Sequence, residues 1–304
     1  MSPAPIPLGN VDSPWGPAPV LHRSALAVEP RDGITGGPAV GVRVGRETRR
    51  SMHVARRARD PLPRYPAEHL PSGAAGRAVL TYDASVQHQA DQQADVVVRL
   101  RLDDPVARWV PRRLDVVVRG PGPILAAEEG GPFVPAWARR VRPWLLPGPA
   151  TSVPRGATTL RFRVVRPSGA PVPWVRAVLF AGALGARVAW GHGDRAGEVL
   201  LVVADAGAVP VDVDEHPAVL RVYGPPTGPP PDPTLDPRDP LATLPPESLG
   251  LVPVASGATG PPPEDDLARG ITPPAGYRAA ADQVVALTVG RTRVLPDQTF
   301  VPRP

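Results

Sequence analysis

Histidine is the residue in this sequence best suited to acid–base or metal chemistry, and the chain carries six: His22, His53, His69, His88, His192 and His216. Zinc ligands usually lie a few residues apart or one helical turn apart. None of the six histidines shows either spacing. The chain also has no cysteine, which excludes disulfides, thiolate metal sites and cysteine nucleophiles. We therefore predict no metal site of this kind.

Two acidic motifs carry the remaining candidates for chemistry. His192 and Asp194 are two residues apart, but Asp194 also opens the tight-turn sequence DRAG, which explains the aspartate without catalysis. Asp212, Asp214 and Glu215 offer oxygen ligands for calcium, yet no glycine-supported series of ligands follows them. We expect neither motif to be a catalytic or ion-binding site.

The sequence lacks the motifs of the common enzyme classes. All 34 basic residues are arginine, so neither a P-loop lysine nor a Schiff-base lysine exists. No G-x-S-x-G elbow and no G-x-G-x-x-G after a strand occurs. We predict a non-catalytic protein without a cofactor.

Composition predicts folded domains joined by extended segments. The 304 residues include 46 prolines and 30 glycines, a level typical of low-complexity or extended chain, yet 42% of the residues are apolar, enough to build cores. No secretory signal and no apolar run long enough to cross a bilayer is visible. We expect a cytoplasmic protein, held there as part of a larger particle.

The most regular stretch, 158–203, predicts four consecutive β-strands. Leu160, Phe162 and Val164 alternate with arginines, as expected for a strand with one buried face. The sequence PSG at 167–169 predicts the first turn. The sequence DRAG at 194–197 predicts another, in which the aspartate side chain bonds a following amide and the glycine takes a positive φ.

This stretch resembles the carboxypeptidase regulatory-like, or transthyretin-like, β-sandwich. The matching pieces are G-x-P-V at 169–172, the following A-V-L strand, and D-x-x-G with a V-L-L strand at 194–201. Trp174 departs from the family pattern, which usually has a small residue there, and so does Gly191-His192-Gly193. The resemblance implies a non-catalytic accessory, adhesive or assembly module.

The residues before this stretch predict a first β-unit. In 95–119, Val98, Leu100 and Leu102 alternate with arginines, and the same alternation follows the turn. This pattern predicts an antiparallel pair with one buried face and one face in water. The sequence DGITGGPAVGVRV at 32–44 has the same order of features as the second unit: a polar turn, a proline and then a strand with alternating valines. We therefore interpret the first domain as a related sandwich and a candidate duplicate.

The predicted fold class is therefore all-β, with two small antiparallel sandwiches of transthyretin or immunoglobulin type and long proline-rich arms. The expected domains are an N-terminal arm at 1–24, a first sandwich at 25–120, a Pro/Trp/Arg connector at 121–157, a second sandwich at 158–223, a proline-rich linker at 224–248 and a C-terminal docking segment at 249–304. We expect the arms and the linker to become ordered by lying across partner molecules.

Arginine and tryptophan dominate interface hot spots, and they mark two candidate docking surfaces. The candidate residues are Arg49, Arg50, Arg56 and Arg57 in the basic patch Arg43–Arg64, and Trp137, Arg139, Arg140 and Trp144 in the connector. The alternatives are a solvated loop for the first group and tryptophans packed on their own domain for the second.

The resulting hypothesis is a structural or adaptor subunit of a large particle, with other protein subunits or a homo-oligomeric ring as partners. By layout the chain is similar to an accessory cap, baseplate or adaptor protein of a phage tail-like contractile injection system. One alternative is a stand-alone module that binds carbohydrate or a cell surface. A second is nucleic-acid binding through the Arg43–Arg64 patch, although no aromatic or helix-turn-helix motif accompanies the patch.

Overall fold

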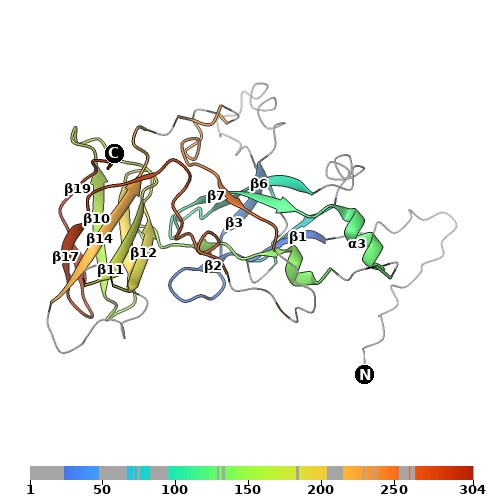
Figure 1. The fold of residues 1–304 in the computed structure, drawn as a ribbon, viewed down its shortest axis with the longest axis horizontal. Coiled ribbons are helices and arrows are strands. Elements are labelled where there is room, and N and C mark those ends of the chain that lie inside the picture. The colour runs from blue at the N-terminus through green and yellow to red at the C-terminus, as the bar shows by residue number, and fades with distance from the viewer. Residues whose placement is uncertain are drawn as a thin grey trace.

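The structure is a computed structural model that describes residues 24–47, 67–70, 72–73, 76–82, 95–128, 130–131, 134–182, 185–203, 215–228, 230–233, 235–236, 238–252, 260 and 264–303. These residues are mostly β, in several small mixed and antiparallel sheets. Figure 1 shows two units side by side along the longest axis. The N-terminal unit holds β1 to β9 and β15, and the C-terminal unit holds β10 to β14 and β16 to β19.

The N-terminal unit contains one large sheet, one small sheet and a two-stranded pair. The large sheet has the order β15-β7-β6-β3-β4, with bounds Glu247–Leu249, Arg112–Val118, Val96–Asp103, Arg43–Glu47 and Ala67–His69. The small sheet has the order β5-β1-β8, with bounds Ala78–Thr81, Ser24–Val28 and Arg140–Val141. The pair joins β2 (Arg31–Asp32) to β9 (Trp144–Leu145), and helices α3 (Pro121–Glu128) and η1 (Ala136–Arg139) precede β8.

Alternation along β6 and β7 places every second side chain in the core of this unit. Leu100, Leu102 and Leu114 are fully buried, and they share one apolar cluster with Leu26 and Leu80 of the small sheet. The prediction of a buried face is confirmed. The prediction that the other face lies in water holds for Val97, which is 65% exposed, but is wrong for Arg101 and Arg113, because part of the chain's C-terminal half covers them, as described below.

The C-terminal unit contains the four strands that the sequence predicts in 158–203. They are β10 (Thr159–Val165), β11 (Arg176–Ala181), β12 (Arg187–His192) and β13 (Glu198–Val202), followed by β14 (His216–Gly224). One sheet has the order β13-β10-β18 and the other β12-β11-β14-β16. Side chains from both sheets build one apolar cluster.

The turn between β12 and β13 has the predicted geometry. The Asp194 carboxylate accepts hydrogen bonds from the backbone N–H of Ala196 (2.8 Å) and of Glu198 (2.9 Å). Gly197 has φ of 75°, which a residue with a Cβ rarely adopts. This aspartate is therefore a turn residue, as expected from the DRAG sequence.

The C-terminal segment docks on the C-terminal unit and extends both of its sheets. β17 (Gln283–Leu287) and β16 (Arg278–Ala279) pair with β14, whereas β18 (Thr292–Val294) and β19 (Gln298–Thr299) lie parallel to β10. The turn at Gly290 therefore carries the chain from one sheet to the other.

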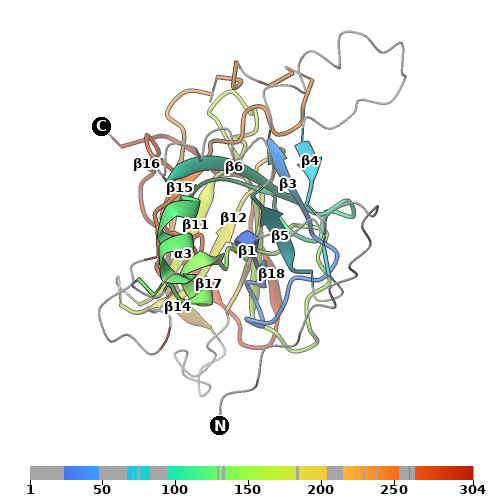
Figure 2. The same ribbon diagram turned by 90° about the vertical axis from the view of Figure 1, so that its right-hand side faces the viewer.

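Two segments expected to connect domains are built into them. Residues 121–157 supply β8 and β9 to the sheets of the N-terminal unit. Residues 225–249, which we call the strap, leave β14, cross to the N-terminal unit and end as β15, parallel to β7. Figure 2 looks along the long axis from the N-terminal unit, with the C-terminal unit behind it.

Candidate functional site

The strap is a packed part of the molecule. Its Leu235, Leu241, Leu244 and Leu249 are buried, and the backbone N–H of Asp232 donates to Ala242 O (2.8 Å) and folds the strap on itself. The expectation that this proline-rich stretch is ordered by a partner molecule is wrong for the described part of the strap. It is ordered by the chain's own two units.

The strap covers a sheet face that carries like charges. Arg101 on β6 and Arg113 on β7 lie directly opposite each other, an arrangement that is destabilising when nothing intervenes. Glu47 at the end of β3 lies between them and accepts hydrogen bonds from Arg101 Nε (3.2 Å) and from Arg113 Nε (2.8 Å). Both arginine side chains are only 1% exposed. One carboxylate cannot neutralise two buried guanidinium groups.

Two strap carboxylates supply the missing charge. The Asp239 carboxylate accepts hydrogen bonds from both terminal nitrogens of Arg101, at 3.2 and 2.5 Å. The Asp232 carboxylate accepts hydrogen bonds from Arg113 Nη2 (2.8 Å) and from Arg99 Nη1 (3.0 Å). An acidic, extended strap thus binds a basic outer sheet face through charge-assisted hydrogen bonds.

Glu247 joins the two units at a fully buried point. Its carboxylate forms ion pairs with Arg112 Nη2 (2.8 Å), on β7 of the N-terminal unit, and with Arg176 Nη2 (2.9 Å), on β11 of the C-terminal unit. Burial alone would raise the pKa of Glu247, but the charges and hydrogen bonds of the two arginines hold the pKa below its usual value. Glu247 is therefore an ionised group that binds both units at once.

His192 closes one side of this junction. Arg176 and His192 are cross-strand partners on β11 and β12, and His192 Nε2 donates to the carbonyl of Gly270 (2.6 Å). Because a carbonyl only accepts, Nε2 carries the proton in this bond, whereas the buried Nδ1 has no hydrogen-bond partner among the described residues. Burial first, and then the charges of Arg176 and Arg112, hold the pKa of His192 well below its usual value.

Trp174 is a buried apolar side chain at the contact between the two units. It is 2% exposed and forms a small cluster with Val110 of the N-terminal unit and Leu241 and Leu244 of the strap. Its indole N–H donates to Thr243 Oγ1 (2.9 Å). Its φ of 61° is unusual for a residue with a bulky side chain, so the surrounding packing holds a strained backbone in place.

Aromatic rings add a second contact between the units. Trp144 on β9 and Trp190 on β12 have ring centroids 6.1 Å apart. The guanidinium of Arg269 lies 5.0 Å from the Trp144 centroid and 4.8 Å from the Trp190 centroid. Such cation–π contacts contribute up to about 2 kcal/mol where the cation is desolvated.

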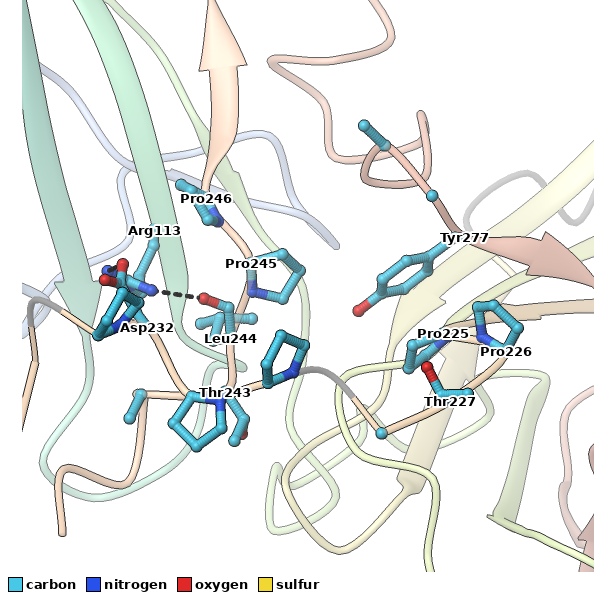
Figure 3. A pocket seen from close by; sticks show the side chains of 17 residues that line it. Arg113, Pro225, Pro226, Thr227, Asp232, Thr243, Leu244, Pro245, Pro246 and Tyr277 are labelled. Atoms are coloured by element: carbon cyan, nitrogen blue, oxygen red, sulfur yellow. Dashed lines mark hydrogen bonds and ion pairs between the residues drawn. The ribbon is translucent and has the colours of Figure 1, made fainter. Parts of the chain in front are cut away.

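A cavity of about 470 Å³ lies between the strap and the loop before β16. Figure 3 shows its walls: Pro225 and Pro226 lie beside the ring of Tyr277, and Pro245 and Pro246 lie on the opposite side with Leu244. The Tyr277 hydroxyl donates to Trp174 O (3.0 Å), and burial raises the pKa of this hydroxyl to about 12. The lining is mostly apolar and holds no catalytic pair.

The docking residues predicted from the sequence fall in three places. Arg49, Arg50, Arg56 and Arg57 lie outside the described residues. Trp144 is a contact between the units, so packing within the chain accounts for it. Trp137 is half-buried, and Arg139 donates to Ser24 O (2.7 Å). Arg140 lies 3.8 Å from the Glu29 carboxylate, at the edge of an ion pair.

The described residues contain no cluster of histidine and carboxylate side chains that could hold a metal ion. Within the same part of the chain, no helix has the length and apolarity that a bilayer crossing requires. Of the two acidic motifs, the second lies mostly outside the described residues.

Sequence reasoning missed the residues that build this joint. The signal was present as complementary charge, because the proline-rich stretch carries Asp232, Asp239 and Glu247 while the expected outer face of β6 and β7 carries arginines. In the sequence, Trp174 stands out only as a departure from the transthyretin-like pattern, and His192 stands out as such a departure and as a candidate for acid–base or metal chemistry. Both belong to the junction.

Comparison of the chain with protein-family models, with curated proteins and with solved structures finds no match.

Proposed function

We propose that this chain is a non-catalytic structural or adaptor subunit of a large protein assembly. The observation that carries the proposal is Glu247, which is fully buried and bonded to Arg112 of one unit and Arg176 of the other. A joint of this kind removes freedom between the units. A subunit that must hold two neighbours at a fixed spacing needs such rigidity, because flexible joints add an entropic cost to every contact.

The finer fold assignment belongs to the same proposal. We propose that each unit is a β-sandwich, the C-terminal one of transthyretin-like type. Its support is the shared core of the two C-terminal sheets and the Asp194–Gly197 turn at the position where the family has one. Modules of this kind are mostly accessory, adhesive or assembly parts.

The particle that we propose is a phage tail-like contractile injection system, in which the chain would serve as a cap, baseplate or adaptor protein. The support for this choice is the layout of the sequence: β-units with proline-rich arms. The arm at 1–24 and the basic patch lie largely outside the described residues.

Sedimentation tests the proposed function. An affinity-tagged copy in the native host should sediment with large particles at a fixed stoichiometry to their other subunits, and electron microscopy of those fractions should show the particles. A chain found only at monomer mass in every fraction, under conditions where such particles form, would contradict the proposal.

A further inference from the structure

The outer face of the small sheet β5-β1-β8 carries a second concentration of arginines. The strand register places these arginines next to one another, because Val28 pairs with Ala78 on one side and with Val141 on the other. The next row therefore contains Arg77, Glu29 and Arg142 side by side on the face opposite the core. Arg140, two residues before Arg142, shares this face.

Glu29 is the one described carboxylate paired with these arginines. It lies 3.3 Å from Arg77 Nε, 3.1 Å from Arg142 Nε and 3.8 Å from Arg140 Nη1. Arg31 lies close enough to join Arg77 and Arg142 in lowering the pKa of Arg140, for which burial is the largest cause. The Asp32 carboxylate is used by its own turn, where it accepts from Ile34 N and Thr35 Oγ1.

The cluster is accessible and has positive charge to spare. The Arg77 side chain is 65% exposed, and those of Arg140 and Arg142 are about a quarter exposed. Three guanidinium groups lie within 3.8 Å of a single carboxylate, that of Glu29. The planar guanidinium presents five N–H donors in a fork that matches a carboxylate.

The other outer face of the same unit shows what binds such a surface. There the arginines of β6 and β7 surround Glu47, and the acidic strap covers them with Asp232 and Asp239. The small sheet repeats the arrangement of several arginines around one glutamate, without a described strap. We propose that the cluster Arg77, Arg140 and Arg142 binds an acidic, extended segment of a partner protein, which deepens the proposed adaptor function and rests on it.

The geometry favours a protein carboxylate over a nucleic acid. A polynucleotide is bound along a basic track with aromatic side chains on which bases stack. Here the guanidinium groups converge on one point, and Glu29 at its centre shows that a carboxylate fits. The negative charge of Glu29 also disfavours a phosphodiester chain laid across it.

Fluorescence anisotropy with the full chain tests the site. The probes are a labelled octapeptide of alternating glutamate and proline, the same peptide with glutamine for glutamate, and an eight-residue oligothymidylate. The variant is Arg140→Gln with Arg142→Gln. The matched control is Arg155→Gln with Arg195→Gln, which removes the same charge from exposed positions in other loops. Circular dichroism melts confirm that both variants fold.

We expect the glutamate peptide alone to bind, and the cluster variant to weaken binding by about tenfold or more, the effect of losing a hydrogen bond to a charged group. The control should change binding less than about twofold, because exposed charges that do not contact the peptide are screened by salt. No binding of the glutamate peptide, equal losses in both variants, or tighter binding of the oligothymidylate would each overturn the proposal.

A separate measurement keeps this site apart from the adaptor function. If the wild-type chain sediments with particles and the folded cluster variant does so equally well, the function stands and the site is not its docking surface, which overturns the inference. Should the wild-type chain remain monomeric while the peptide still binds at the cluster, the adaptor function fails and carboxylate binding survives.

Discussion

Arg176 of the C-terminal unit and Glu247 of the strap form an ion pair with an Nη2–Oε1 distance of 2.9 Å and side-chain exposures of 1% and 0%. The same carboxylate also binds Arg112 of the N-terminal unit. Two buried positive charges around one negative charge cost desolvation energy, which a hydrophobic contact would not. The ionic joint instead fixes the relative orientation of the two units, because only one placement satisfies all the hydrogen bonds.

Replacement of Glu247 by glutamine should therefore be strongly destabilising. The variant leaves two buried guanidinium groups without a counter-charge, which costs about 3–5 kcal/mol of unfolding free energy. Urea denaturation followed by tryptophan fluorescence measures this loss. As a control, Arg187→Gln breaks a partly exposed pair with Asp266 and should cost less than about 1 kcal/mol. Equal losses in the two variants would contradict the assignment of Glu247 to the joint.

The lowered pKa of His192 should make the free energy of unfolding depend on pH. In the unfolded chain its pKa is about 6.5, and in the folded chain burial and the neighbouring arginines lower it well below that. Between these two values the unfolded chain binds a proton that the folded chain does not. Stability is therefore complete above pH about 6.5 and falls with decreasing pH below it, by up to about 1.4 kcal/mol per pH unit.

Urea unfolding at a series of pH values from about 7.5 to 5 checks this dependence. The variant His192→Gln keeps an N–H donor for Gly270 O but cannot take up a proton, so its stability should fall less steeply in that range. A slope unchanged by His192→Gln would show that other groups control the acid response.

Trp174→Ala should loosen the strap as well as lower stability. The substitution removes a buried indole that packs on Leu241 and Leu244 and bonds Thr243, and such truncations cost about 3–5 kcal/mol. Hydrogen exchange should show faster amide exchange at Leu241 and Leu244, while the amides of β6 stay protected. Trp137→Ala, at a half-buried position, should leave exchange in the strap unchanged. Uniform loss of protection would contradict a local role for Trp174.

The strands of both units could be predicted from the sequence because their signal is local. Alternation of Val98, Leu100 and Leu102 with arginines is set by the two-residue period of a strand, whatever lies elsewhere. The Asp194 turn is likewise determined within four residues. For the same reason, the number and order of strands in 158–203 followed directly from the pattern.

The strap could not be predicted in this way because its partners are distant in the sequence. Asp232 contacts Arg99, 133 residues away, and Asp239 contacts Arg101 across 138 residues. Proline content favours extended chain both on a surface and in a linker, so it does not separate the two. Outer-face arginines normally indicate water, and only the carboxylates of the strap reverse that expectation here.

Two turn glycines offer a direct test of the C-terminal unit. Gly169 and Gly197 both have positive φ, at 81° and 75°. A Cβ at Gly169 would meet no atom within 4 Å, so Gly169→Ala should cost about 1–2 kcal/mol from backbone strain alone. A Cβ at Gly197 would lie 2.5 Å from Val164 O and 3.0 Å from Val172 O, which are backbone atoms that cannot swing aside. Gly197→Ala should therefore cost clearly more than Gly169→Ala in urea denaturation. Equal costs would mean that β10 and the chain before β11 do not approach the turn as closely as this structure has them.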